Sequence, residues 1–318
     1  MRTTLYMMIG LPGSGKTTLA KEISQLHINA KHISSDALRL ELFGNEEDRE
    51  NNHIVFNEMK RRTKEHLNNG ISVVYDATNI SSKRRIAFLK ELKKINCKKI
   101  CIYVATPFEK CIENNLKRER KVDVDAILKM YKSLQVPAYY EGWDDIIIHC
   151  NESKKYNKCI FNLANNISYE TYCNDILRYA SKDCIELAQD NPYHTLSVSR
   201  HMYKSFLNIN NKTDDTKLII AALLHDIGKP FCKNFKDGNI FANFYGHDNV
   251  SAQMALVYLY KMGINTDIIL DIVQYIQLHM QLLNIKDNEK GLLKLKNKIG
   301  DTIFNNLLLL SEADIAAK

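Results

Sequence analysis

The pattern of hydrophobic and polar positions divides the chain into two parts. Between residues 4 and 150, short apolar runs alternate with segments in which apolar residues recur every three or four positions. This alternation is typical of a parallel sheet with crossover helices, so we expect an α/β fold there. After about residue 168, strand-like runs become rare and long amphipathic segments follow, which predicts an all-α second half. The predicted strands are 5–10, 32–35, 72–77, 99–105 and 145–149, and the predicted helices include 18–26, 86–94, 125–134, 218–224, 251–261 and 266–283.

The length of the chain fits two domains, because 318 residues are about twice a common domain size. The polar segment NESKKYNK at 151–158 is the expected start of the connection between them. We therefore predict an α/β domain over 1–152, a linker over 153–170 and an all-α domain over 171–318.

The composition indicates an ordinary globular protein, with 45% hydrophobic and 25% charged residues. The eight cysteines include no Cys-x-x-Cys pair, which argues against a zinc ribbon and a secreted disulfide framework. No signal-peptide pattern and no apolar stretch of roughly 20 residues is evident, so we expect a cytoplasmic protein without membrane association. The net charge of +7 favours polyanionic partners, although alone it is weak evidence.

A glycine-rich loop follows the first predicted strand and leads into a predicted helix. It fits the pattern G-x-x-x-x-G-K-[ST], which wraps backbone N–H groups around nucleotide phosphates. Lys16 would reach the β- and γ-phosphate oxygens of ATP, and Thr17 would bind Mg²⁺. The residues expected to hold the nucleotide are Gly10, Pro12, Gly13, Ser14, Gly15, Lys16, Thr17 and Thr18.

Two acids follow the next predicted strands. Asp36 comes after the second strand, with Arg39 one helical turn later. An acid there can accept the proton of an acceptor alcohol while the arginine clamps a neighbouring phosphate, although a helix-capping role for Asp36 is also open. Asp76 follows the third strand, at the edge where ligands of such sheets bind and Mg²⁺-linked acids occur, and a capping role is again the alternative.

Residues 6–134 resemble the polynucleotide 5′-kinase family of phage and bacterial RNA repair. The matching segments are GLPGSGKTT, SSDALR, DATN followed by Arg84-Arg85, and NNLKRER. The resemblance implies that Asp36 is the general base on a 5′-hydroxyl and that Arg39 binds the phosphate beside the terminal nucleoside. Lid arginines would grip the ATP phosphates; Arg118 is preferred and Arg120 remains possible. Further expected substrate contacts are Asp76, Thr78, Asn79 and Arg85.

The second half contains an adjacent histidine and aspartate, His225 and Asp226, at the end of an apolar helix. Neutral imidazole and carboxylate suit Mn²⁺, Fe²⁺, Ni²⁺, Co²⁺ or Zn²⁺. Residues 190–318 resemble the HD phosphohydrolase family, which implies a phosphoester hydrolase holding one such ion. The ligands implied are His201, His225, Asp226 and Asp314, with Glu312 as the fallback for the last and His194 as a phosphate contact or alternative first ligand. Lys229, His247 and His279 are expected substrate contacts, the two histidines also being candidates for a second metal.

Together the two halves predict an enzyme that heals nucleic acid ends. The first would phosphorylate a 5′-hydroxyl, and the second would remove a 3′-phosphate or open a 2′,3′-cyclic phosphate. The expected partners are RNA or DNA with 5′-OH ends and a separate ligase. A small-molecule or nucleoside kinase fused to a nucleotide hydrolase is the main alternative, and a non-catalytic RNA sensor is another. The sequence ends four residues after Asp314, so a short HD domain and a longer natural chain both remain open.

Overall fold

The computed structural model describes residues 2–26, 30–46, 50–152, 160, 167–193, 195–285 and 287–318. They form two compact units: Met1–Met130 with Pro137–Asn151, and Tyr131–Val136 with Glu152–Lys318. Residues 131–136 therefore group with the second unit, whereas the sequence analysis placed them in the first domain. Most of the predicted linker lies outside the described residues.

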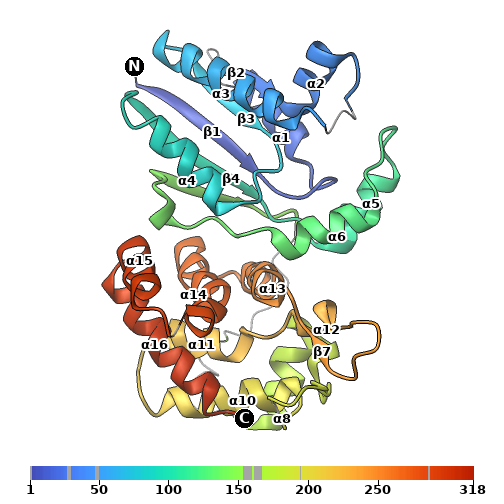
Figure 1. Ribbon diagram of the computed structural model, residues 1–318, viewed down its shortest axis with the longest axis vertical. Helices are drawn as coiled ribbons and strands as arrows, with labels where there is room; N and C mark the ends of the chain where they lie inside the picture. The colour runs from blue at the N-terminus through green and yellow to red at the C-terminus, as the bar shows by residue number, and fades with distance from the viewer. Residues whose placement is uncertain are drawn as a thin grey trace. The chain divides into compact units, whose positions relative to one another are not determined.

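The first unit is built on a five-stranded parallel sheet (Figure 1). Its strand order is β2-β3-β1-β4-β5, and every neighbouring pair is parallel. This confirms the predicted α/β class. The strands are β1 (Thr3–Ile9), β2 (Ala30–Ser34), β3 (Ser72–Asp76), β4 (Cys97–Val104) and β5 (Asp145–His149). The helices are α1 (Lys16–Leu26), α2 (Ser35–Phe43), α3 (Asn52–Asn68), α4 (Ser82–Glu91), α5 (Phe108–Leu116), α6 (Val124–Ser133) and η1 (Tyr139–Glu141).

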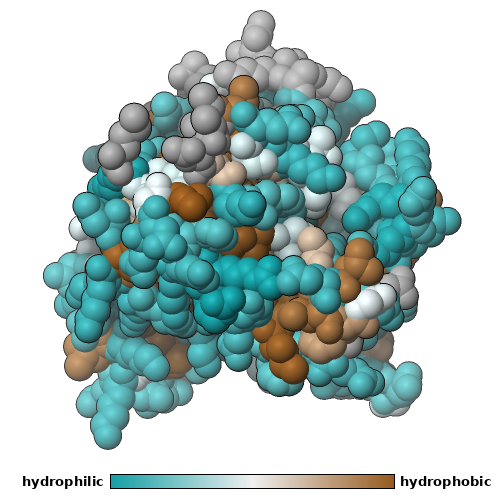
Figure 2. Space-filling view, turned by 90° about the horizontal axis from the view of Figure 1, so that it is seen from above, coloured by the Kyte–Doolittle hydropathy of each residue, from teal (hydrophilic) through white to brown (hydrophobic). Residues whose placement is uncertain are grey.

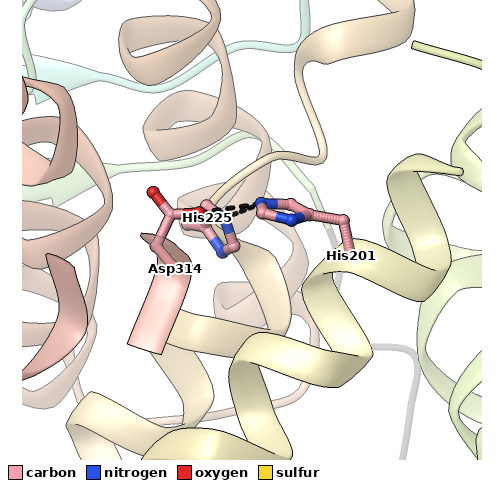
Figure 3. Close-up of side chains that lie close together, drawn as sticks. All are labelled: His201, His225 and Asp314. Atoms are coloured by element: carbon pink, nitrogen blue, oxygen red, sulfur yellow. Dashed lines mark hydrogen bonds and ion pairs between the residues drawn. The ribbon is translucent and has the colours of Figure 1, made fainter. Parts of the chain in front are cut away.

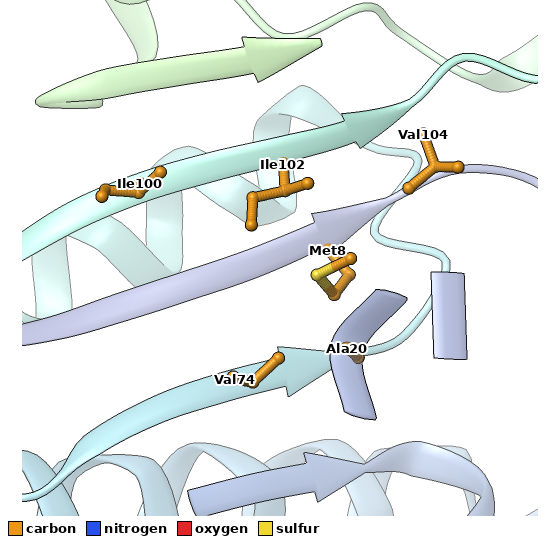
Figure 4. Packing of buried hydrophobic residues seen from close by; sticks show 6 residues of the cluster. All are labelled: Met8, Ala20, Val74, Ile100, Ile102 and Val104. Carbon is orange, nitrogen blue, oxygen red and sulfur yellow. The ribbon is translucent and has the colours of Figure 1, made fainter. Parts of the chain in front are cut away.

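Both faces of this sheet are covered, which explains why its strands are nearly continuous apolar runs. On one face, α1 inserts Ala20 among side chains of β1, β3 and β4 (Figure 4). On the other face, Phe88 of α4 contacts the ring of Tyr75, with the ring centroids 5.3 Å apart. Successive strand residues point to opposite faces. Val74 therefore packs on the face covered by α1, and Tyr75 packs on the face covered by α4. The buried cluster of the first face comprises Met8, Ala20, Val74, Ile100, Ile102 and Val104.

The strand register brings the sequence motifs of the first unit to one edge of the sheet. Met8 of β1 and Ser34 of β2 both pair with Asp76 at the end of β3. The glycine-rich loop, the start of α2 and Asp76 therefore lie at neighbouring carboxyl ends, where sheets of this kind bind ligands.

The second unit is helical, with one exception. Helices α10, α11, α14 and α16 pack against one another, and α13 packs on α14. The unit also contains a short antiparallel pair, β6 (Asn234–Phe235) and β7 (Ala242–Asn243), which leaves its helical class as predicted. The helical elements are α8 (Tyr169–Thr171), η2 (Tyr172–Leu177), α9 (Arg178–Ala180), η3 (Lys182–Cys184), α10 (Val198–Asn210), α11 (Thr216–Leu224), α12 (Lys229–Cys232), α13 (His247–Lys261), α14 (Thr266–Ile285), α15 (Glu289–Ile299) and α16 (Asp301–Ile315).

Residues 131–136 belong to the second unit because two buried glutamines bind their backbone. Gln253 of α13 donates to the carbonyl oxygens of Tyr131 at 2.8 Å and Leu134 at 3.2 Å. Gln277 of α14 accepts from the Val136 N–H at 2.6 Å and donates to its carbonyl at 3.1 Å. These four hydrogen bonds join the backbone of this segment to α13 and α14.

Helix α14 is long and apolar enough to cross a membrane by length and composition, and 61% of its most apolar window is buried inside the structure. A helix over 266–283 was predicted from the sequence, but its apolar length was not recognised. Because α14 packs against α11, α13 and α16, its apolar faces are used by the core of the second unit. The face of the molecule seen in Figure 2 is mainly hydrophilic, with hydrophobic side chains in small separate patches.

Candidate active sites

The glycine-rich loop has a backbone that requires glycine. Gly13 has φ 79°, and a Cβ there would lie 2.2 Å from the carbonyl oxygen of Cys111. The loop ends where α1 begins, at Lys16, so the helix N-terminus faces the same space. Lys16 is buried, and its Nζ donates to the carbonyl oxygen of Leu11 at 2.7 Å. The loop can therefore surround an anion with N–H groups and one ammonium.

Two side chains distant in sequence support this loop. Asn114 donates from Nδ2 to the carbonyl of Gly13 at 2.9 Å, and Thr106 donates to the carbonyl of Ser14 at 2.8 Å. Ser14 Oγ is buried and has no hydrogen-bond partner among the described residues, as expected of a hydroxyl that awaits a ligand. The sequence analysis assigned no role to Thr106, and contacts about 90 to 100 residues apart leave no local pattern to read.

A carboxylate stands beside the Mg²⁺-binding threonine. Asp76 is 3% exposed, and its Oδ2 lies 3.2 Å from His32 Nε2. Burial opposes ionisation of Asp76, but hydrogen bonds from His32 and Thr17 and the charge of Lys16 hold its pKa below the ordinary value. An ionised Asp76 next to the Thr17 hydroxyl is the donor set that Mg²⁺ prefers. The sequence analysis missed His32.

Asp36 lies in the first turn of α2, after the cap residue Ser34, so it does not occupy the N-cap. Its Oδ1 lies 2.6 Å from Arg39 Nη1, and its Oδ2 lies 3.0 Å from Arg120 Nη1. Arg39 is buried and also donates to Asn52 Oδ1 at 2.8 Å, whereas 40% of the Asp36 side chain stays exposed. An accessible carboxylate is thus fixed between two guanidinium groups.

The turn between α5 and α6 carries both lid arginines. Buried Asn115 closes this turn, because its amide donates to the Val122 carbonyl at 2.8 Å and accepts from the Val122 N–H at 3.0 Å. Arg120 reaches Asp36, and the charge of Arg118 contributes to lowering the pKa of Lys16. The two arginines therefore face different parts of the site: one faces the acid and the other faces the loop lysine.

In the second unit, three side chains from three helical segments converge. His201 comes from α10, His225 follows α11 and Asp314 lies in the last turn of α16 (Figure 3). His201 Nε2 lies 2.8 Å from Asp314 Oδ1 and 3.4 Å from His225 Nε2. All three are buried, and one potential ligand atom from each lies within 4.8 Å of the others.

A second set adjoins the first and consists of Asp226, His247 and His279. Asp226 connects the two sets. Its Oδ2 lies 3.4 Å from both His201 Nε2 and His225 Nε2, and its Oδ1 lies 3.2 Å from His247 Nε2. One carboxylate therefore faces both groups of imidazoles, as a ligand shared by two metal ions would.

The imidazole rings are oriented for metal binding. The Nδ1 atoms of His201, His225, His247 and His279 lie 2.6–3.1 Å from backbone carbonyl oxygens, which can only accept. In the neutral rings the proton therefore belongs on Nδ1, and the lone pairs of Nε2 point into the centre. His247 Nε2 and His279 Nε2 are only 3.2 Å apart, and the nearby Asp226 Oδ1 is buried without a hydrogen bond from the described residues. Such an assembly of lone pairs fits divalent metal ions.

Comparison with known proteins matches both units. Residues 5–137 match the AAA domain family model, and residues 193–314 match the HD domain family model. The first part of the chain is thus similar to AAA domains and the second part to HD domains.

Individual relatives match parts of the chain. The L-seryl-tRNA(Sec) kinase of Methanococcus maripaludis is 26% identical over 168 residues. That alignment covers 49% of this chain and 63% of the relative, so the chain spans less than two thirds of that protein. Similar solved structures include a protein assigned as a kinase from Chloroflexus aurantiacus, 17% identical over 47% of this chain and 89% of that one, with a TM-score of 0.41. Another is a fungal RNA kinase, 16% identical over 56% of this chain and 87% of that one, with a TM-score of 0.35.

Three residues expected to touch substrate in the P-loop domain form hydrogen bonds within the protein. Arg85 is 2% exposed and forms a bidentate pair with buried Glu141, at 2.7 Å for Nε and 2.5 Å for Nη2. Its Nη1 donates to the carbonyl of Asn79, whose own amide donates to the Met8 carbonyl at 2.7 Å. The carbonyl of Thr78 accepts from Gly10 N–H. In this structure the Arg85 guanidinium and the Asn79 amide bind groups of the protein itself, and their predicted contacts with substrate stay predictions.

The other predicted residues of the HD domain have different positions in the structure. Lys229 lies at the centre, with Nζ 2.6 Å from Asp226 Oδ2 and 2.7 Å from Gln189 Oε1. Glu312, the fallback ligand, points away from the centre and pairs with Lys212 at the surface. His194 lies outside the described residues. His247 and His279, expected as substrate contacts, stand where a second metal would bind.

The charges of the HD centre are strongly coupled. Burial alone would lower the pKa of His225, but Asp226 and Asp314 outweigh it and raise that pKa to about 10. His279 shows the opposite result: burial and the neighbouring His225 and His247 lower its pKa to about 3. Without metal the centre thus retains a proton on His225, which a cation would displace.

Proposed function

We propose that the chain heals nucleic acid ends, using the P-loop domain as a 5′-hydroxyl kinase and the HD domain as a phosphoesterase on 3′-phosphate or 2′,3′-cyclic phosphate ends. The observation that carries the kinase part is Asp36, accessible and held between Arg39 and Arg120 at the edge of the sheet that carries the glycine-rich loop. The negative charge of Asp36 also acts to raise the pKa of Lys16.

In the proposed kinase reaction, Asp36 accepts the proton of the terminal alcohol as its oxygen attacks the γ-phosphorus of ATP. The bond from that phosphorus to the ADP oxygen breaks. Arg39 holds the phosphate of the adjacent nucleotide, because a guanidinium anchored by Asn52 offers a fixed pair of donors. Lys16 and the lid arginines stabilise charge on the transferred group.

In the proposed phosphoesterase, His201, His225 and Asp314 would hold one metal ion, and Asp226, His247 and His279 could hold another. Such ions supply Lewis-acid polarisation of a phosphoryl oxygen and acidify water. Lys229 binds a phosphoryl oxygen of the substrate through a charge-assisted hydrogen bond. Cytoplasmic location and a separate ligase that seals the healed ends complete the proposal.

A second acceptor follows from one relative. The L-seryl-tRNA(Sec) kinase is named for a seryl group carried on tRNA, and its likeness spans 49% of this chain. A hydroxyl attached to RNA, rather than the 5′-end of a strand, is therefore the alternative substrate of the kinase site.

The test is transfer of labelled phosphate from ATP to three acceptors: a 5′-OH oligonucleotide, a free nucleoside and seryl-tRNA. We expect kcat/KM for the oligonucleotide to exceed that for the nucleoside by at least about 100-fold, because Arg39 needs the adjacent phosphate. Arg39→Lys should reduce the oligonucleotide value more than the nucleoside value. A higher kcat/KM for the nucleoside or for seryl-tRNA would mean that this molecule, and not the 5′-OH end of an oligonucleotide, is the acceptor.

A further inference from the structure

A pocket of about 780 Å³ opens over the HD centre. Its inner part is buried and charged, with Asp226, Lys229 and His279 no more than 5% exposed. Its outer part is aromatic and exposed. The pocket therefore has one end suited to a phosphoryl group and another suited to a flat ring. The aromatic lining residues are Tyr193, Phe241, Phe244 and Tyr245.

The outer aromatics are more exposed than packing would require. Tyr193 is 72% exposed, Tyr245 is 70% exposed and Phe241 is 45% exposed. Single exposed apolar side chains are common, but several large rings around one pocket mark a binding surface. A ligand that consists of a phosphate group alone would not require these exposed rings.

Backbone hydrogen bonds hold these rings around the opening. The N–H of Ala242 in β7 donates to the carbonyl of Asp190 at 2.8 Å, which joins the β6–β7 hairpin to the loop carrying Tyr193. The Tyr193 N–H donates to Asn191 Oδ1 at 3.0 Å, and the Phe241 N–H donates to Asn239 Oδ1 at 2.9 Å. These hydrogen bonds hold the backbone at Tyr193, Phe241 and Ala242 beside the pocket.

Positive charge accompanies the rings. Lys236 Nζ lies 5.5 Å from the centre of the Tyr245 ring, and Lys229 Nζ lies 5.5 Å from the centre of the Phe244 ring. Ammonium groups beside aromatic faces favour a ligand that combines a flat ring with negative charge. A purely apolar ligand would place no negative charge beside these ammonium groups.

We propose that this pocket recognises the terminal nucleoside of its substrate by stacking the unpaired base on Tyr193, Phe241 and Tyr245 while the attached phosphate reaches the HD centre. This inference rests on the proposed phosphoesterase and names its substrate class: a phosphorylated end whose last base is unstacked from a duplex. Stacking accepts any base, because every base has a π face.

The test measures binding apart from hydrolysis. Metal-loaded protein is titrated against two 5′-dye-labelled oligonucleotides that end in a non-cleavable 3′-methylenephosphonate, one with a terminal adenine and one abasic at that position. We expect the adenine to lower Kd by about 5- to 150-fold, the usual worth of base stacking. Tyr245→Ala and Tyr193→Ala should remove most of this difference, whereas Tyr245→Phe should keep it. Ile240→Ala is the matched control, because Ile240 is 79% exposed near the same hairpin and does not line the pocket.

A parallel assay measures hydrolysis of cleavable 3′-phosphate and 2′,3′-cyclic phosphate ends with and without the terminal base. Equal binding of the two ligands, or cleavage that ignores the base, overturns the inference and leaves the proposed phosphoesterase intact. Binding that depends on the base and on Tyr245, without cleavage of either end, overturns the proposed reaction and leaves the nucleobase pocket.

Discussion

At the scale of single residues, the kinase site depends on Asp36, whose carboxylate is shared between Arg39 and Arg120. Asp36→Asn keeps the shape of the side chain but removes the proton acceptor. We expect kcat for phosphate transfer to fall about 100-fold or more, with little change in ATP affinity, since general bases typically contribute that much. Rapid-quench assays and nucleotide titration give the two values.

Glu46 offers the matched control for Asp36, because it also faces Arg120, at 3.5 Å, and is similarly exposed. Glu46→Gln should change kcat less than about fivefold, since exposed ion pairs contribute little. Equal losses in the two variants would mean that Asp36 only positions the arginine.

Lys16 predicts a pH dependence for nucleotide binding. Burial, together with the charge of Arg118, lowers the pKa of Lys16 to about 8 despite nearby Asp76. ATP phosphates favour the ammonium form, so above pH 8 binding must take up a proton, and affinity should fall as pH rises, by up to about tenfold per unit. Without nucleotide the sign differs: the unfolded chain holds this proton more tightly, so the free energy of unfolding should rise between pH 8 and 10.5.

Calorimetry in buffers of different ionisation enthalpy detects this proton uptake directly. Lys16→Arg is the control, because a guanidinium stays charged throughout this range and should abolish the pH dependence. An ATP affinity of the wild type that is constant from pH 7.5 to 9.5 would contradict the assignment.

At the scale of elements, the lid turn depends on Asn115, which is 1% exposed and binds both backbone groups of Val122. Asn115→Ala would leave these groups without their partner and loosen the turn that carries Arg118 and Arg120. We expect kinase kcat to fall about tenfold or more while HD hydrolysis stays unchanged. A fall in both activities would indicate general unfolding instead.

Sequence patterns predicted the elements of this fold well where periodicity was strong. The five strands and the helices α1, α4 and α6 were predictable because each is a run of several residues with one dominant period, whereas α3 was not named. The β6–β7 pair was not, since strands of two residues carry no period. The grouping of residues 131–136 with the second unit could not be read from the sequence, because the glutamines that bind them, Gln253 and Gln277, lie more than 115 positions away.

The candidate sites show the same limit. Local motifs identified the glycine-rich loop and the His225-Asp226 pair. Tertiary contacts were missed, as with His32 beside Asp76 and with Arg85, whose partner Glu141 lies 56 positions away. Spacing alone also gave no sign that Asp226 faces two groups of histidines.

At the scale of the whole molecule, we expect metal removal to change the melting temperature of one unit and not of the other. The HD centre gathers buried imidazoles and carboxylates, which bind metal only in the folded state, so metal binding stabilises folding. A chelator should lower the melting temperature of the HD domain, and Mn²⁺ or Zn²⁺ at 100 times its Kd should restore about 2.7 kcal/mol.

The P-loop domain should melt at the same temperature with and without chelator when Mg²⁺ and nucleotide are absent. Scanning calorimetry of the full chain, with Asp314→Asn as the metal-site control, separates the two transitions. Loss of stability in the P-loop transition alone would contradict the assignment of the metal centre.

The central claim is that two independent sites treat the two ends of one nucleic acid strand. It is tested most directly by incubating the full chain with ATP, Mg²⁺, Mn²⁺ and an oligonucleotide bearing a 5′-OH and a 2′,3′-cyclic phosphate, and identifying both product termini by mass spectrometry. The account predicts a 5′-phosphate and a processed 3′-end in the wild type, only the processed 3′-end for Asp36→Asn, and only the 5′-phosphate for Asp226→Asn. An oligonucleotide returned unchanged at both ends by the wild type would contradict it.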